Sequence, residues 1–302
     1  MRFSKRGLVF KTNNAPEWMQ GGAIVPTPLV LADRIRIFLG FRDYTGKSRI
    51  GFCDVDKENP HKILGVSEEP VLDIGKPGMF DENGVVPTCV LQEGGKVFLY
   101  YAGYSLGYNV RFQVFTGLAV CEDSSLERFA RIQEYPVTDR AGSAELFRVI
   151  HSVLKVDTTY KVWYGAGNRF LQGRRKTLPV YDVRYMESNS KSSFPSSGKI
   201  VIDIPKGCHR VGRPYVVHES GLYKMFYGYG SEAVPYQLAY AESLDGICWT
   251  QKEIGLELSD SGWDSQMMAY PAFVRTKNKA FLFYNGNDYG KEGFGYAELV
   301  EE

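Results

Sequence analysis

Hydrophobic and polar residues alternate in short stretches along the whole chain. Segments such as RIRIFLGF, KVFLYYAGY and LYKMFYGYG are rich in β-branched and aromatic residues, and polar turns separate them. This composition and this spacing are typical of β-strands. Because no long stretch has the 3.6-residue period of an amphipathic helix, we expect helices to be nearly absent.

A pattern of three strands recurs along the chain, with steps of 61, 64, 63 and 57 residues, which indicates internal repeats. Alignment of the second strands puts into one column Leu39, Tyr100, Tyr164, Tyr227 and Tyr284. Thirteen residues before them lie Pro26, Pro87, His151, Pro214 and Pro271. The third strands align an acidic residue, which is Asp54, Glu122, Glu187, Glu242 or Glu298. A β-sandwich with accidental similarity is the alternative, but three independent registers agree on repeats.

These repeats predict an all-β fold, a single five-bladed β-propeller domain over residues 1–302 with four-stranded antiparallel blades. The last repeat ends after its third strand, at the end of the chain, while residues 3–10 (FSKRGLVF) belong to no repeat. We therefore expect residues 3–10 to pair with 294–299 and to close the ring. Closure would remove the free sheet edges that promote aggregation.

Composition narrows the class of protein. A formal net charge of +1 argues against a general nucleic-acid binder, and no stretch of about 18 apolar residues predicts a membrane span. The N-terminus has no apolar region typical of a signal peptide. Five scattered cysteines without a CxxC spacing favour reduced thiols in a cytoplasmic protein, unless a leader has been removed from the mature chain.

Candidate site residues come from two kinds of position. In an up-and-down propeller, the starts of the innermost strands and the ends of the second strands lie on one face, around the mouth of the channel. The acids at strand starts, which we take as catalytic candidates, are Asp81, Glu145 and Asp264. The substrate-binding candidates are Arg42, Asp43, Tyr104, Asn168, Arg169, Arg210, Arg213, Tyr229, Gln266, Asn285 and Asn287.

Each candidate has a structural alternative. Asp81 and Asp264 could serve turns, and Asp43 could only pair with Arg42 or Arg49. Asn285 and Asn287 could satisfy loop backbone, and His151 is more typical of a core histidine than of a ligand. Sequence alone does not decide whether these side chains serve a turn, an ion pair or a site.

Carboxylates around one pocket suit glycoside cleavage, in which one acid protonates the leaving oxygen and the other attacks or activates water. Arg213 directly precedes Pro214 on an inner strand, where a buried guanidinium needs an anion. Arginines also recognise carboxylates and phosphates through paired hydrogen bonds, so we expect a carbohydrate ligand that is anionic or rich in hydroxyl groups. The chain has no Gly-rich phosphate loop, HExxH motif, His/Cys cluster or GxSxG elbow, and we expect no cofactor and no metal.

The repeats resemble the five-bladed propellers of the arabinanase, β-xylosidase, levansucrase and invertase superfamily of glycoside hydrolases. The segments FRDYTGKSRIG, GMFDENGVVP, YAESLDGICW and GWDSQMMAYP, with the final FYNGNDYGKEGFGYAEL, are similar to a less characterised group of bacterial propellers that often accompany surface-polysaccharide genes. The resemblance implies glycoside hydrolysis and maps the family's acids onto Glu145 and Asp81.

One position departs from that superfamily. Its usual acid beside the proline of the first inner strand is absent here, where the chain reads Ala23-Ile24-Val25-Pro26. Asp43, Asp264 or no residue would have to replace it. A propeller that binds or transfers sugars during surface-polysaccharide assembly, without hydrolysis, therefore stays open as the alternative function.

Overall fold

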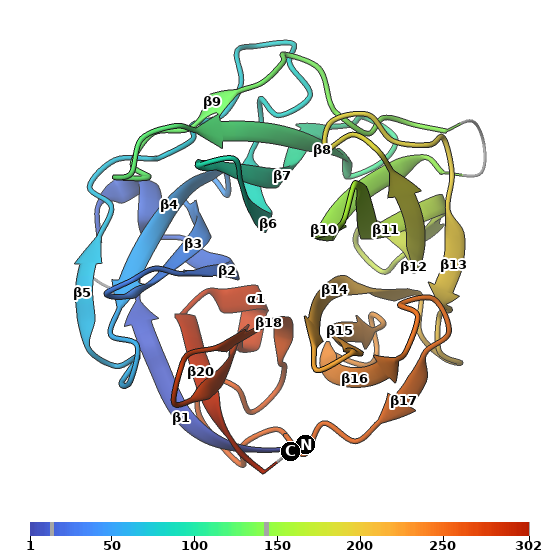
Figure 1. Ribbon diagram of the computed structural model, residues 1–302. Helices are drawn as coiled ribbons and strands as arrows, with labels where there is room; N and C mark the ends of the chain where they lie inside the picture. The colour runs from blue at the N-terminus through green and yellow to red at the C-terminus, as the bar shows by residue number, and fades with distance from the viewer. Residues whose placement is uncertain (13–14, 142–144, 302) are drawn as a thin grey trace.

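The computed structural model describes residues 1–12, 15–141 and 145–301. Nearly all regular structure in this part of the chain is β-strand, with one short 3-10 helix, η1 (Glu17–Met19), and one short turn of helix, α1 (Asn287–Gly290). The strands form four-stranded antiparallel groups that stand side by side in a ring (Figure 1). This arrangement is consistent with a propeller.

The strands of each group mostly follow one another in the chain, and we name each group by its innermost strand. The β2 group contains β2 (Gly22–Val30), β3 (Ile35–Arg42), β4 (Ser48–Val55) and β5 (Ile63–Val66). The β6 group contains β6 (Val85–Glu93), β7 (Lys96–Leu106), β8 (Phe112–Cys121) and β9 (Ala130–Arg131). The β10 group contains β10 (Phe147–Val156), β11 (Thr159–Gln172), β12 (Thr177–Ser188) and β13 (Lys199–Ile202). The β14 group contains β14 (Arg210–Glu219), β15 (Leu222–Gly230), β16 (Gln237–Ser243) and β17 (Thr250–Lys252).

The β18 group is completed from the other end of the chain. It contains β18 (Ala269–Arg275), β19 (Ala280–Asn285), β20 (Gly293–Glu301) and the N-terminal strand β1 (Arg2–Lys11). β1 runs antiparallel to β20, with Phe3 opposite Leu299 and Phe10 opposite Phe294. The two termini accordingly lie together (Figure 1). The predicted pairing of residues 3–10 with 294–299 is confirmed.

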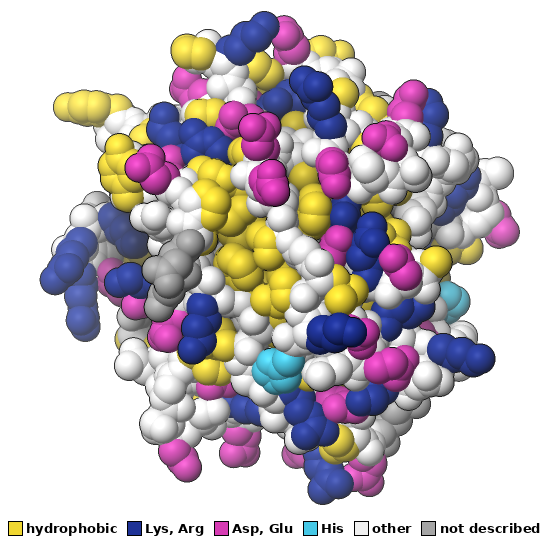
Figure 2. Space-filling view, turned by 90° about the vertical axis from the view of Figure 1, so that its left-hand side faces the viewer, with side chains coloured by type: hydrophobic (Ala, Val, Ile, Leu, Met, Phe, Trp, Pro, Cys, Tyr) yellow, Lys and Arg dark blue, Asp and Glu magenta, His cyan; other side chains and the backbone are white. Residues whose placement is uncertain are grey.

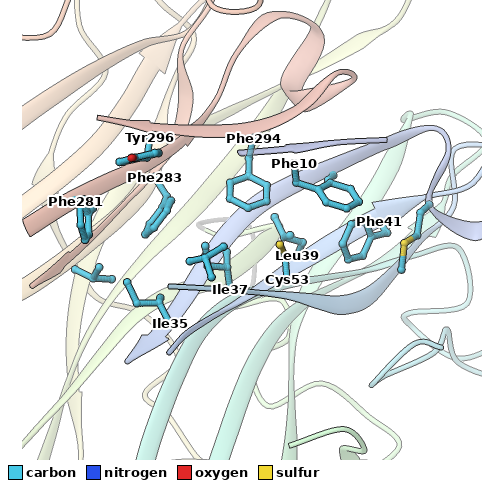
Figure 3. Packing of buried hydrophobic residues seen from close by; sticks show 14 residues of the cluster. Phe10, Ile35, Ile37, Leu39, Phe41, Cys53, Phe281, Phe283, Phe294 and Tyr296 are labelled. Carbon is cyan, nitrogen blue, oxygen red and sulfur yellow. The ribbon is translucent and has the colours of Figure 1, made fainter. Parts of the chain in front are cut away.

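Apolar side chains fill the space between neighbouring groups. Between the β18 and β2 groups, Phe10 of β1 joins Leu39, Phe41 and Phe283 in one buried cluster (Figure 3). Its ring lies 5.6 Å from that of Phe41, in an edge contact. Phe10 thus ties the N-terminal strand to the core as well as to a sheet edge.

Each inner strand carries a β-bulge, where two residues face one residue of the second strand. In β10, for example, Ile150 pairs with Tyr164 and Ser152 with Trp163, which leaves His151 unpaired. The equivalent bulge residues are Pro26, Thr88, His151, Pro214 and Pro271. A bulge residue needs no ladder hydrogen bond, so proline is tolerated there, and this explains the recurrent proline.

The bulges correct the alignment of the second repeat. Pro87 pairs with Tyr101, and the unpaired residue is Thr88, so Tyr101 rather than Tyr100 is the equivalent of Tyr164. The thirteen-residue spacing holds, but it runs from Thr88. Likewise Tyr101 pairs with Gly117 on β8, which places Val120, not Glu122, in the column of acidic residues. The proline one residue before the bulge misled the alignment.

The side of the ring that carries β5 is mixed in charge (Figure 2). Around β5, side chains of both signs surround a small group of hydrophobic ones (Figure 2), in keeping with the net charge of +1. In the described residues, no helix is both long and apolar enough to span a membrane.

Candidate functional site

An apolar floor lies where the inner strands meet. It contains Val25 of β2, Val86 of β6 and Phe147 of β10, which belong to one buried cluster, and Tyr104, Tyr181 and Tyr270 pack against it. Because these side chains come from different groups, the cluster marks the middle of the ring on the face where the second strands end.

Arg210, at the start of β14, is surrounded by tyrosines above this floor. Its Nη2 donates to the Tyr289 hydroxyl over 2.8 Å, and its guanidinium lies 4.4 Å from the centre of the Tyr236 ring. Burial alone would lower the pKa of Arg210. The tyrosine oxygens around it, with that of Tyr181 the strongest, outweigh burial, so the pKa of Arg210 is raised. We call Arg210 with Tyr104, Tyr181, Tyr236, Tyr270 and Tyr289 the tyrosine–arginine mouth.

Further cations stand at the edge of this mouth. Burial, and then the charges of Arg111 and Arg210, lower the pKa of Lys176, so these three cations lie near one another. In the described part of the chain, no ion pair links Arg42, Arg111 or Arg210 to an acid. The Glu232 carboxylate opposes the shift at Lys176, but the mouth holds more cations than nearby acids.

A hollow of about 360 Å³ adjoins the mouth between the β10 and β14 groups. Arg169 and Val180 line one side, and Asp203, Lys206 and His209 line the other. His209 is 7% exposed, and its Nε2 has no hydrogen-bond partner among the described residues. Burial, and then Arg210, lower the pKa of His209, so this imidazole is neutral at pH 7.

The three predicted catalytic acids are buried, each between a tyrosine and a cation. Asp81 accepts hydrogen bonds from Tyr101 (3.0 Å) and from Arg131 (2.8 Å). Asp264 accepts one from Tyr284 (2.8 Å) and pairs with Lys5 of β1 (2.7 Å). Their exposed fractions are 0% and 2%. Both acids are thus held inside their own groups.

Glu145 is enclosed in the same way, with an exposed fraction of 0%. It accepts a hydrogen bond from Tyr164 over 3.0 Å and pairs with Arg148 (2.7 Å) and Arg184 (2.9 Å). The same Arg184 also pairs with Asp182 over 2.7 Å. No hydrogen bond or ion pair between described residues joins Asp81, Glu145 and Asp264 to one another. Their catalytic role stays a prediction.

Three of the predicted binding residues have hydrogen-bond partners within the protein. Asp43 bonds the backbone of Thr45 and Lys47 and pairs with Arg49. Asn285 bonds Val25, and Asn287 bonds the backbone of Gln266. These three side chains hold loops and strands in place, as their structural alternatives supposed.

Other predicted residues lie on the mouth face and are more open. Asn168, Arg169 and Gln266 are exposed, and Arg42 and Tyr104 are half-buried. Tyr229 is half-buried too and donates to Gln237 over 3.1 Å. Arg213 is only 3% exposed and bonds backbone carbonyls rather than an acid. The expected anionic partner of Arg213 is therefore not a side chain among the described residues.

The residues of this region that sequence reasoning did not select include Tyr181, Asp182, Tyr236 and Tyr270. Tyr181 and Tyr236 lie near the starts of the third strands, a position that our selection of strand ends left out. Tyr270 directly precedes the recurrent proline, as Arg213 does, and both have positive φ angles of 58° and 56°. That shared position was the signal available in the sequence. Burial raises the pKa of Asp182, although Arg184 opposes the shift.

No cluster of three or more His, Cys, Asp or Glu side chains suited to a metal occurs in the described residues. No protein-family model matches the chain. It is 31% identical over 304 residues to the uncharacterised protein Rv1502 of Mycobacterium tuberculosis, covering 99% of each chain. A second M. tuberculosis protein, MT1551, is 30% identical with the same coverage.

Several solved structures are similar over nearly the whole chain. A glycoside hydrolase gives a TM-score of 0.72 at 16% identity, covering 99% of this chain and 93% of its own. A thermostable family-43 glycoside hydrolase gives 0.68 at 19% identity, covering 97% and 94%. A β-1,2-mannobiose phosphorylase from Listeria innocua gives 0.71 at 12% identity, covering 99% and 97%. At these identities the likeness shows a common fold.

Proposed function

Since this chain belongs to the family of the mycobacterial proteins Rv1502 and MT1551 and has the fold of propeller glycoside hydrolases, we propose that it is a single-domain, five-bladed glycoside-processing propeller. Its ligand is an anionic sugar held at the tyrosine–arginine mouth. The resemblance to glycoside hydrolases supports the carbohydrate class, and the mouth supports the anionic character.

The observation that carries this proposal is the composition of the mouth. Arg210 is enclosed by aromatic rings, and its Nε has no partner among the described residues. Arg111 and Arg210 lie close enough to Lys176 to lower the pKa of its ammonium group, after burial. Arg210 is half-buried, whereas Arg111 and Lys176 are exposed at the edge of the mouth. Such a group of cations attracts a negatively charged ligand, and a guanidinium suits a carboxylate or a phosphate. Tyrosine rings add faces and hydroxyls that suit a sugar.

The geometry favours binding or group transfer over hydrolysis by Asp81, Glu145 and Asp264. A general acid must reach the glycosidic oxygen, and these carboxylates are enclosed by tyrosine and cation. The alternative function, a sugar-binding or sugar-transferring propeller in surface-polysaccharide assembly, is therefore our first candidate.

Hydrolysis is the second candidate, and Asp182 gives it a specific basis. Asp182 and Glu145 are two carboxylates bridged by one guanidinium, that of Arg184. Burial raises the pKa of Asp182, while Glu145 lies between two arginines. Carboxylates with unlike environments can divide the roles of acid and base. In such a hydrolase Asp182 is the proton donor and Glu145 is the second carboxylate.

A paired screen tests both candidates. Neutral aryl glycosides, uronic acids and sugar phosphates would be scored by product release and by thermal shift. We expect saturable stabilisation by anionic sugars only, and a loss of at least about tenfold in affinity in Arg210→Met, because a charge-assisted hydrogen bond contributes about 1.5–3 kcal/mol. The matched control is Arg175→Met, an exposed arginine in the same region.

Two outcomes would redirect the proposal. Turnover that disappears in Asp182→Asn, with binding retained, would establish the hydrolase and place its acid. Equal binding of neutral and anionic sugars, unchanged in Arg210→Met, would refute the anionic ligand.

A further inference from the structure

The bulges of the inner strands bring backbone carbonyls together in the centre of the ring. Arg213, on β14, reaches across to this level. Its Nη1 donates to the carbonyls of Thr88 (2.5 Å) and His151 (3.5 Å), and its Nη2 donates to the carbonyl of Pro26 (3.1 Å). These three acceptors are bulge residues of three other groups. The Arg213 guanidinium therefore lies where the β2, β6, β10 and β14 groups meet.

The charge of this guanidinium has no acidic counterpart in the described structure. Burial lowers the pKa of Arg213 to about 10, with Tyr215, Cys89 and Tyr270 acting in the opposite direction. Arg213 therefore stays protonated at pH 7. Backbone carbonyls and the Thr27 hydroxyl (3.0 Å) accept its Nη hydrogens but supply no net charge, and an uncompensated buried charge is costly.

Three polar atoms around this charge lack hydrogen-bond partners among the described residues. They are Nε of Arg213, Oγ1 of Thr88 and Nδ1 of His151. Arg213 and Thr88 are 3% and 1% exposed. Thr88 and His151 occupy bulge positions that hold proline in the other inner strands, so polar side chains replace apolar ones beside Arg213. Burial, and then Arg213, hold the pKa of His151 well below its usual value, so His151 adds no positive charge.

We propose that Arg213 Nε, Thr88 Oγ1 and His151 Nδ1 form a site for one small monovalent anion of the chloride class inside the ring. Arg213 and Thr88 each offer a hydrogen, and His151 offers another in its Nδ1-protonated tautomer. A single negative charge balances the single guanidinium. This site is separate from the sugar ligand of the mouth.

The test replaces methanesulfonate by chloride at constant ionic strength and records the melting temperature of the full-length protein. We expect a saturable rise of about 2–4 °C at ten times the dissociation constant, from ligand linkage and the usual unfolding entropy of a protein of this size. Thr88→Val removes one donor with little change of shape and should shift the half-saturating chloride concentration upward by about tenfold. Thr250→Val, at an exposed position of β17, is the control and should leave it unchanged.

Two further measurements distinguish this site from the mouth and from the outer surface of the protein. Chloride stabilisation should persist in Arg210→Met, because the mouth is a different place. Crystals grown in bromide should show an anomalous peak within hydrogen-bond distance of Arg213 Nε and Thr88 Oγ1. A melting temperature that follows ionic strength alone, a Thr88→Val variant with an unchanged chloride response, or bromide peaks confined to the surface would each overturn the proposal.

Discussion

Glu145→Gln should destabilise the protein severely, whatever its effect on activity. Glu145 is fully buried and balances Arg148 and Arg184. When the charge of Glu145 is lost, Arg184 still has its ion pair with Asp182. Arg148, 4% exposed, keeps the Pro195 carbonyl, the Met186 sulfur and the face of the Tyr164 ring, but no acid among the described residues. Removal of one partner of a buried ion pair costs about 3–5 kcal/mol, and we expect a loss in this range.

Urea unfolding at pH 7 measures the loss as a change in the free energy of unfolding. Glu187→Gln is the matched control, because Glu187 is an exposed acid of the same group that also accepts a tyrosine hydroxyl. It should cost under about 1 kcal/mol, as surface substitutions usually do. The double variant Glu145→Gln/Arg148→Met removes the stranded cation and should recover most of the loss.

A different result would refute this reasoning. If the free energy of unfolding of Glu145→Gln lies within about 1 kcal/mol of the wild-type value, the buried ion pair contributes little to stability. The burial of Glu145 then has no structural role. If turnover also disappears in that stable variant, Glu145 is catalytic, and the sequence-based prediction is the better one. A double variant less stable than Glu145→Gln would show that Arg148 has another indispensable partner.

Two further predictions concern ring closure and acid stability. Phe10→Ala should lower the free energy of unfolding by about 3–5 kcal/mol, the usual cost of removing a buried phenylalanine, because its ring joins β1 to Phe41 and Phe294; an unchanged urea midpoint would contradict the role of β1 in closure. Hydrogen bonds from Lys155, then Lys191, then Tyr160 lower the pKa of Glu93 to about 2, so its stabilising contribution is complete above about pH 4.5 and is lost as the pH falls toward 2. Glu93→Gln should therefore flatten the acid limb of stability between pH 5 and 2, whereas Glu134→Gln, an exposed control, should leave the slope as in the wild type.

The sequence predicted the strands, the repeats and the N-terminal closure because each rests on local pattern and on the need to pair a sheet edge. Register was harder. Either Pro87 or Thr88 could be the residue that bulges out of the ladder. Only the pairing of Cys89 with Tyr100 shows that it is Thr88. A one-residue difference of this kind is decided by packing across the sheet, which a single sequence does not display.

The candidate site was predicted only in part, because it too depends on packing between segments that are distant in the chain. The sequence placed acids and arginines on one face, but not which of them the protein itself neutralises. Asp81 and Asp264 pair with Arg131 and Lys5, which lie 50 and 259 residues away in the chain. No local signal predicts such partners. Tyr181 and Tyr236 were missed because their place at the mouth depends on how third strands of neighbouring groups approach each other.

The repeats also indicate where function should be sought. Asp81 and Asp264 each lie seven residues before the bulge, at Thr88 and Pro271, and each bonds the second-strand tyrosine of its own group. Met19 lies seven residues before Pro26, and there the second-strand residue is Leu39. Met19 and Leu39 share one apolar cluster.

Acid and tyrosine are thus replaced together by two apolar residues. In the β14 group the tyrosine, Tyr227, stays although Gly207 stands seven residues before Pro214, so the two residues do not always change together. Where the pair occurs, its contacts lie inside one group, as the internal packing of a repeat requires. A sugar bound at the centre of the ring meets each blade differently, so residues that recognise it need not recur. Arg210, Lys176 and Asp182 have no counterpart of the same type in every repeat. The chemistry of this protein is therefore to be tested first at those unrepeated residues.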